Sequence, residues 1–404
     1  MIKLIMDGAL FSECEMFGSN RHGMLRIAEE VVKEFMHYNE FDISFVNTIY
    51  SKKYDSFLKK FLEKRYPTYR GKILSKTPIL SSSLPGLSIL SKYFAKYLSL
   101  EVKSTGLDKG DIYHSFYYPF NKNIIRNADI KKSITYLDII PLRMKGYGKA
   151  MVDITKQVVK SIVSNYAIAI SEFSKQDLLD YNNEISADRV FVAPLAASKE
   201  LFFQNKNREE WVRVKRKYSL PDNYFLSVSS ADRRKNLPHL IKCFSQFLLQ
   251  EKPQDLFLVL TGNTTYSYAI LNLKLNIDKA VRDKIIISNR YIENEDLSVV
   301  YSNALCFFFM SLYEGFGLPA LEAMQCGVPV VTSNVCSLPE VVGNAAIMIN
   351  PKDEMELCNT MNEVYNNEAL RAKYAALGMV RANDFSWQKC ANDYIEIFKK
   401  IALS

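Results

Sequence analysis

Short, continuous apolar runs alternate with segments of helical period along the whole 404-residue chain. The runs that indicate strands are FDISFV (41–46), SITYL (133–137), YAIAIS (166–171), RVFVAP (189–194), YFLSVS (224–229), LFLVLTG (256–262), KIIIS (284–288), LCFFFM (305–310) and VPVVTS (328–333). The segments between them that favour helices include 24–35, 237–249, 297–302 and 319–326. Strands that are apolar throughout are typical of parallel sheets covered by helices on both faces. The pattern predicts a doubly wound α/β architecture.

The composition of the chain changes near residue 200, which indicates two domains of ordinary size. The segment from about 197 to 222 is polar and charged and ends in Leu-Pro-Asp before strand composition returns. We expect an N-terminal domain over 1–197, a linker over 198–221 and a C-terminal domain over 222–384. The last stretch, 385–404, has the period of one amphipathic helix.

Composition excludes several classes of protein. No run reaches the ~18 apolar residues that span a bilayer, and the start MIKLIMDGALFSECE turns acidic too early for a signal peptide. The seven cysteines are scattered without a CxxC pair, so neither a disulfide framework nor a zinc site is indicated. We therefore expect a protein of the reducing cytoplasm.

The net charge of +8 arises from one stretch, 51–110, which holds thirteen Lys/Arg and four Asp/Glu, a surplus of nine. Within 52–65 the basic residues are interleaved with Phe57, Leu58, Phe61 and Leu62 at helical spacing. Such a helix can bind anionic lipid head groups at about 1 kcal/mol per basic residue. The alternative is an ordinary domain helix with a solvated basic side. No nucleic-acid-binding motif accompanies the charge, so we expect no nucleic-acid partner.

Two glutamates, Glu314 and Glu322, flank a Gly-Phe-Gly turn between an apolar strand and the helix LPALEAMQCG. Open α/β sheets bind ligands at the carboxyl ends of their strands, where this turn falls. Gly315 and Gly317 permit unusual backbone dihedrals, and Pro319 suits the first turn of a helix. The N–H groups at that helix start can bind a diphosphate.

A nucleotide sugar fits this arrangement, with Glu322 near the ribose and Glu314 at the other end of the diphosphate. Two alternatives remain. Residues 315–320 also fit the GxGxxA dinucleotide fingerprint, although that turn normally follows the first strand of its domain. The segment could also be a purely structural turn followed by helix-forming residues.

A second candidate anion site lies in FLSVSSADRRKNLPHLIKCF (225–244), which predicts a strand, a polar turn and a helix. Arg233, Arg234 and Lys235 stand at the junction, and Asn236 could cap the helix. Basic residues at the carboxyl end of a strand can neutralise a leaving diphosphate. A basic surface cluster is the alternative.

These segments resemble the retaining glycosyltransferases of family 4, with the GT-B fold, and in particular bacterial surface-polysaccharide mannosyltransferases. The resemblance covers nearly the whole chain and rests on 18–35, 135–142, 167–181, 230–241, 291–311, 313–333 and 337–351. The pair of glutamates separated by seven residues is its most specific motif. The resemblance implies two Rossmann-like domains facing a cleft, with the donor on the C-terminal domain, the acceptor on the N-terminal domain, and the last helix crossing back to the N-terminal domain.

The resemblance also implies residue roles. Glu322 would bind the ribose, and Glu314 would contact the donor sugar near its anomeric centre. Arg234 and Lys235 would stabilise the leaving diphosphate, so the catalytic set is Glu314, Arg234 and Lys235. The other expected substrate-binding residues are Gly23, Asp138, Gly262, Tyr291, Gly315, Phe316, Gly317, Leu318 and Glu322.

The chain departs from the family where Leu137 precedes Asp138, because histidine often stands at position 137. His114 is a candidate to replace that side chain, and a packed or solvated histidine is the alternative. Met310 and Arg290 are further departures. No Asp-x-Asp occurs and the four histidines form no ligand pair, so we expect no metal and no other cofactor.

The predicted function is retaining, metal-independent transfer of a sugar, with mannose as the best guess, from a GDP- or UDP-sugar. The acceptor would be a growing bacterial surface glycan such as an O-antigen, linked to polyprenyl diphosphate, at the inner face of the plasma membrane. The alternatives are a catalytically silent nucleotide-sugar-binding partner subunit and a glycan phosphorylase, although we find no site for the lysine-bound cofactor that such phosphorylases use.

Overall fold

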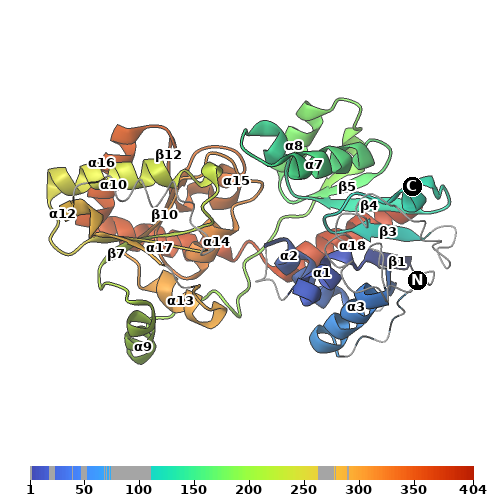
Figure 1. Cartoon of the computed structure of the whole chain (residues 1–404), viewed down its shortest axis with the longest axis horizontal. Helices are drawn as coiled ribbons and strands as arrows, with labels where there is room; N and C mark the ends of the chain where they lie inside the picture. Colours follow the sequence, from blue (N-terminus) through green and yellow to red (C-terminus); the bar gives the residue numbers. More distant parts are fainter. Residues whose placement is uncertain are drawn as a thin grey trace, which may run out of the picture. The chain divides into compact units, whose positions relative to one another are not determined.

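The computed structural model describes residues 2–17, 23–38, 40–46, 52–67, 69, 71, 73, 111–262, 277, 279–288 and 291–404. The chain divides into two compact units, each built on a six-stranded parallel sheet (Figure 1). The first unit comprises Met1–Ile170, Ser174–Ala193 and Trp387–Ser404, and the second comprises Ser171–Phe173 and Pro194–Ser386. The predicted α/β fold class is confirmed. The final helix, α18 (Trp387–Leu403), belongs to the first unit.

In the first unit the strand order is β2-β1-β3-β4-β5-β6. The strands are β1 (Ile2–Asp7), β2 (Phe41–Val46), β3 (Ile112–Ser115), β4 (Lys131–Tyr136), β5 (Tyr166–Ala169) and β6 (Val190–Val192). The helices, in addition to α18, are α1 (Ala9–Phe17), α2 (Gly23–Phe35), α3 (Lys52–Arg65), α5 (Lys122–Arg126), α6 (Ile140–Arg143), α7 (Lys149–Ile162) and α8 (Glu172–Tyr181).

In helix α3 the apolar stripe predicted from the sequence is packed inside the unit. Leu58, Phe61 and Leu62 are buried, and α3 packs against α1, while Lys59 and Lys60 are exposed. This stripe is therefore part of a core and does not face a lipid surface. Residues 74–110, the rest of the basic stretch, lie outside the described residues. In the part of the chain that the structure describes, no helix combines the length and the hydrophobicity needed to cross a bilayer.

In the second unit the strand order is β12-β11-β10-β7-β8-β9. The strands are β7 (Tyr224–Val228), β8 (Phe257–Thr261), β9 (Ile285–Ile287), β10 (Cys306–Phe309), β11 (Val330–Ser333) and β12 (Ile347–Ile349). Numbered from β7, this is the 3-2-1-4-5-6 order of the Rossmann fold, whose direction of winding reverses between β7 and β10. That reversal point is where such sheets bind ligands.

The helices of the second unit are α9 (Arg208–Tyr218), α10 (Leu237–Glu251), α12 (Lys279–Arg282), α13 (Asn294–Ser302), α14 (Leu318–Gln325), α15 (Leu338–Val342), α16 (Glu354–Asn366) and α17 (Glu368–Ala382). Helix α10 packs with α16 and helix α14 packs with α17, on opposite sides of the strands in Figure 1. Each predicted helix between 237 and 326 matches an observed helix to within three residues at either end.

The segment predicted to be a linker, 198–221, contains helix α9, which packs on α13. The Asn207 side chain caps α9 by accepting hydrogen bonds from the amides of Glu209 and Glu210. The buried Asp296 carboxylate of α13 then accepts from Arg213, Lys217 and Tyr218 of α9. The charges that made this segment look like a linker therefore anchor it to the second unit.

Candidate active site

Two turns predicted from the sequence meet at the reversal point of the second sheet. They are the basic turn, Arg233–Lys235, and the glycine turn, Gly315–Gly317. Strands β7 and β10 are neighbours there, with Phe225 paired to Cys306. After β7 the chain forms a short 3-10 helix, Arg233–Lys235, in which the Asp232 side chain accepts a hydrogen bond from the Arg234 amide. The Leu312 amide, just after β10, donates to the Arg234 carbonyl at 2.7 Å. The two turns are thus held together by backbone as well as by side chains.

Glu314 lies between the two cations. Its Oε1 is 2.5 Å from Lys235 Nζ, and its Oε2 is 2.6 Å from an Arg234 guanidinium nitrogen. Glu314 and Lys235 are both buried, and Lys235 Nζ also lies 4.6 Å from the centre of the Phe309 ring. Asp232 Oδ2 also lies 3.6 Å from Arg234 Nε, so the cluster holds two cations and two carboxylates.

The pKa shifts of the cluster follow from burial and charge. Burial alone would raise the pKa of Glu314, but the charges of Lys235 and Arg234 and the hydrogen bond from Lys235 hold that pKa below its ordinary value. Burial lowers the pKa of Lys235, and the Glu314 carboxylate opposes this. Glu314 is therefore ionised at neutral pH.

Asn236 occupies the predicted cap position of α10 but does not act as a side-chain cap. Its backbone is left-handed, with φ of 56°, and its side-chain amide donates to the Pro351 carbonyl at 2.7 Å. Asparagine tolerates this conformation better than most residues, which explains its place at the junction. The predicted side-chain cap is therefore wrong, although the position of the helix start is confirmed.

The glycine turn is held by hydroxyl groups. The Ser337 hydroxyl lies 2.9 Å from the carbonyl oxygens of both Glu314 and Phe316, and the Ser171 hydroxyl donates to the Gly315 carbonyl at 2.6 Å. Gly317 has φ of +111°, and a Cβ there would lie 2.6 Å from a methyl carbon of Leu338. Only glycine fits position 317 without strain.

Three consecutive amides follow from this turn. In a trans peptide the N–H points opposite to the preceding C=O, so fixing the carbonyls of Gly315 and Phe316 fixes the amides of Phe316 and Gly317. Within the described residues, the amides of Phe316, Gly317 and Leu318 donate to no protein acceptor. They stand at the N-terminus of α14, whose dipole adds a partial positive charge. The Phe316 side chain is buried against Phe385, so only its backbone is left to bind a ligand.

Glu322 lies one turn into α14 and is buried, with the Tyr301 hydroxyl donating to its Oε2 at 3.2 Å. Gly262 directly follows β8 and has φ of +140°, and a Cβ there would lie 2.2 Å from the carbonyl oxygen of Ser229, which follows β7. Tyr291, just before α13, is 39% exposed. These three residues belong to the second unit, as does the cation cluster.

The remaining predicted residues belong to the first unit. Gly23 begins α2, and the Asp138 carboxylate accepts from the Ile140 amide at 3.0 Å, at the start of α6. The suggestion that His114 replaces the missing histidine is wrong. Its ring is fully buried, bonded to the hydroxyls of Ser133 and Thr135, and burial lowers its pKa to about 3.

Sequence reasoning missed Ser337, Ser171 and Tyr301 as candidate site residues. Ser337 and Ser171 lie in the stretches SLPE and SEFS that carry the family resemblance. A serine in a loop, however, belongs to no periodic pattern from which its contacts could be predicted. Tyr301 occupies an apolar helical position, where an aromatic residue normally indicates a core. Only the tertiary contacts identify the three.

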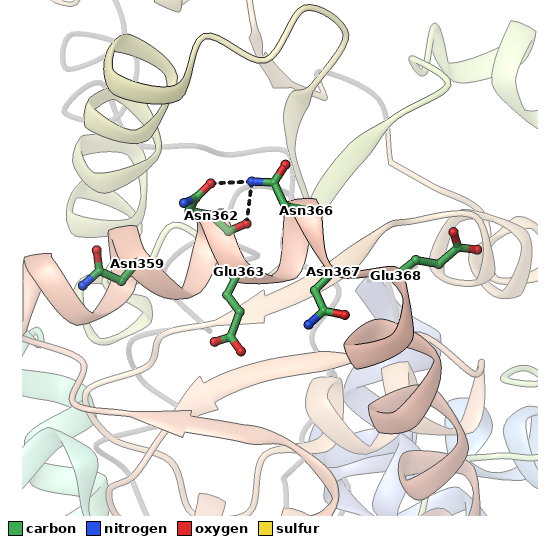
Figure 2. A pocket seen from close by; sticks show the side chains of 6 residues that line it. All are labelled: Asn359, Asn362, Glu363, Asn366, Asn367 and Glu368. Atoms are coloured by element: carbon green, nitrogen blue, oxygen red, sulfur yellow. Dashed lines mark hydrogen bonds between the residues drawn. The ribbon is translucent and has the colours of Figure 1, made fainter.

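A surface depression lies away from these residues, where α16 ends and α17 begins. Figure 2 shows its lining side chains, Asn359, Asn362, Glu363, Asn366, Asn367 and Glu368. Its amides bond partly to one another, since Asn366 donates to Asn362, and its two carboxylates would repel a diphosphate. Among the described residues, no three His, Cys, Asp or Glu side chains gather as metal ligands.

Residues 207–378 match the sequence family described as "Glycosyl transferases group 1". The chain is 34% identical over 233 residues to an O-antigen chain mannosyltransferase B from Escherichia coli, covering 57% of this chain and 60% of that protein. It is 29% identical over 265 residues to an MMP alpha-(1->4)-mannosyltransferase from Mycolicibacterium hassiacum, covering 64% of this chain and 59% of that protein. The chain therefore matches less than two thirds of the length of these relatives.

Solved structures share the fold over the whole chain. A sucrose-phosphate synthase from Thermosynechococcus elongatus superposes with a TM-score of 0.69 at 16% identity, covering 100% of both chains. Anabaena HepE in complex with UDP-glucose superposes with a TM-score of 0.68 at 14% identity, covering 99% of this chain and 100% of that one. The predicted GT-B fold and the resemblance to bacterial surface-polysaccharide mannosyltransferases are confirmed.

Proposed function

We propose that the chain transfers a sugar from a nucleoside-diphosphate sugar to a glycan, because residues 207–378 match the family described as "Glycosyl transferases group 1". The observation that carries this proposal is the row of amides from Phe316 to Leu318, which donate to no acceptor among the described residues, beside the Arg234–Lys235–Glu314 cluster. The amides bind the diphosphate, Glu322 binds the ribose, and Glu314 lies next to the transferred sugar.

The cation pair supports a mechanism that needs no metal ion. Departure of the sugar leaves negative charge on the diphosphate, and Arg234 and Lys235 stabilise that charge. Both cations contact Glu314, and Arg234 also donates to the Tyr313 carbonyl, so two positive charges are held where the diphosphate would leave. We further propose that the sugar is transferred with retention of configuration, as in the glycosyltransferase family that the sequence resembles.

Mannose is the sugar we propose, because two relatives in Escherichia coli are named as an O-antigen chain mannosyltransferase and a serotype-specific mannosyltransferase. The acceptor is then a growing bacterial surface glycan. Incubation with GDP-mannose, other GDP-sugars and UDP-sugars, with and without EDTA, tests this proposal by release of the nucleoside diphosphate. Release that requires a divalent ion contradicts metal independence, and no release from any donor contradicts the transferase assignment.

A second candidate function is a silent nucleotide-sugar-binding subunit. The observation that favours it is the absence of a histidine at position 137, where Leu137 stands, together with the burial of His114. The same assay separates the two candidates. A silent subunit binds the nucleotide sugar with no hydrolysis and no transfer, whereas the proposed enzyme releases the nucleoside diphosphate.

We also propose a lipid-linked acceptor, reached from the inner face of the plasma membrane. Lys59, Lys60 and Lys64 are exposed on α3, where Lys59 pairs with Glu63 and Lys60 with Glu15. Anionic head groups attract such lysines over about 8 Å at physiological salt. Flotation with anionic vesicles tests this part alone. A chain that stays with the soluble fraction at low salt contradicts it and leaves the transferase proposal intact.

A further inference from the structure

We propose that Ser337 is a positioning residue for the diphosphate, a role that rests on the proposed function. Its hydroxyl fixes the peptide plane that joins Phe316 to Gly317, so that the Gly317 amide faces the ligand. The Ser337 hydroxyl is fully buried and lies 2.9 Å from each of two carbonyl oxygens of that turn, those of Glu314 and Phe316.

The first argument is that Ser337 does not perform the role its position suggests. It stands at the N-cap of α15, where a serine normally accepts a hydrogen bond from an amide of the first helical turn. Its side chain makes no such bond. The hydroxyl points instead at the glycine turn, more than twenty residues earlier in the chain.

The second argument is peptide geometry. The Phe316 carbonyl belongs to the same peptide plane as the Gly317 amide, and the two point in opposite directions. A hydroxyl that holds this carbonyl on the Ser337 side therefore turns the Gly317 amide to the other side. Glycine at 317 has the widest choice of backbone conformations, so its peptide has the greatest need of an external constraint.

The third argument is that α15 holds the turn by a second route. The Glu340 carboxylate of α15 accepts from the amides of Glu172 and Phe173, at 3.0 and 3.1 Å. The residue before them, Ser171, donates to the Gly315 carbonyl, whose peptide carries the Phe316 amide. The start of α15 thus fixes two consecutive carbonyls of the turn. Ser337 contacts the Phe316 carbonyl directly, and Glu340 supports the Gly315 carbonyl through the segment 171–173.

The contact between Leu338 and Gly317 completes this support. A Cβ at position 317 would approach a Leu338 methyl carbon to 2.6 Å, so the start of α15 lies directly against the turn. The Ser337 hydroxyl cannot be replaced there by bulk water, since the site is closed. A hydroxyl is therefore the group that this position supplies to the turn.

Binding measurements on Ser337→Ala and Ser337→Gly test the proposal. We expect the affinity for GDP or UDP to fall about tenfold, which corresponds to about 1.4 kcal/mol, while the affinity for the matching nucleoside changes less than about twofold. Ser337→Thr keeps a hydroxyl and should recover most of the loss. Ser298→Ala, which removes another buried serine hydroxyl in the same unit, is the matched control and should bind like the parent.

A purely structural role predicts a different result. It would lower the affinities for nucleoside and diphosphate together, or change neither, and either result overturns the proposal. If the parent protein binds neither GDP nor UDP, the proposed function fails, and a crystal structure of ligand-free Ser337→Ala still tests the positioning. A 316–317 peptide that keeps its orientation in that crystal overturns the inference, and a rotated peptide supports it.

Discussion

The ammonium group of Lys235 lies 2.5 Å from Oε1 of Glu314, although 79 residues separate the two in the chain. Both side chains are buried, and Arg234 contacts the other carboxylate oxygen. A buried ion pair contributes little to stability by itself, because desolvation opposes the attraction. Its position at the edge of the sheet where folds of this type bind ligands therefore favours a role in binding or catalysis.

Lys235→Met should lower the turnover number by about 10²- to 10³-fold, the effect of removing one donor to a developing oxyanion. The nucleotide dissociation constant should change only a few-fold, because the amides of the glycine turn remain. Steady-state kinetics with the donor identified by the release assay provide the measurement. Lys242→Met, which removes an exposed lysine paired with Glu354, is the control. Undiminished turnover in Lys235→Met would rule out its transition-state role.

Stability should depend on pH through Glu314. Its pKa lies below the ordinary value of 4.5 in the folded protein, so on acidification the unfolded chain binds the proton first. The contribution of the ionised Glu314 to the free energy of unfolding is complete above about pH 5. It is lost as the pH falls through the pKa of Glu314 in the folded protein. Glu314→Gln should therefore be less stable than the parent at pH 7, by about 3–5 kcal/mol, and this gap should narrow below about pH 4.5.

Urea unfolding of the second unit at several pH values between 7 and 3.5 measures that gap. Glu363→Gln, at an exposed carboxyl of α16, controls for general acid effects and should follow the parent at every pH. A gap for Glu314→Gln that stays constant over this range would show that the carboxylate charge is not what stabilises the fold.

Gly317→Ala should weaken diphosphate binding and destabilise the second unit, by about 1–3 kcal/mol from the backbone alone and further from contact with Leu338. Two other glycines separate these causes. Gly146 has φ of +106° with open space around it, so its alanine variant carries the dihedral strain only. Gly148 has open space and an ordinary φ of −63°, so its alanine variant should be nearly neutral. Thermal unfolding measures the stability of the three alanine variants. Equal losses of stability in Gly317→Ala and Gly148→Ala would contradict the strain at position 317.

Asp296→Ala should destabilise the second unit by about 3–5 kcal/mol, because Arg213 and Lys217 lose a buried counter-charge and Tyr218 loses its acceptor. Asp222→Ala breaks the exposed pair with Lys215 and should change stability by less than about 1 kcal/mol. Chemical unfolding of both variants gives the comparison. If Asp296→Ala lost as little stability as Asp222→Ala, apolar contacts and not the Asp296 carboxylate would hold α9 in place.

The parts of the structure that local pattern controls were predictable. FDISFV matches β2 residue for residue, and the glycine turn and its following helix lie where GFGLP predicted them. The direction of a side chain was harder to predict. A histidine on a strand can face a ligand or the core, and only the packing around β3 shows that the His114 ring faces the core. The Lys235–Glu314 contact and the Ser337 bonds were beyond sequence reasoning, because each needs strands or helices that are distant in the chain to be neighbours in space.

The insertion of β10 beside β7 has a consequence for biosynthesis. During synthesis Lys235 emerges 79 residues before Glu314, so the proposed nucleotide site is incomplete in that interval. Completion of the second sheet and appearance of binding activity are then one event. Affinity for a nucleoside diphosphate would therefore report how much of a preparation has matured, and a tight-binding nucleotide would rescue variants that mature poorly.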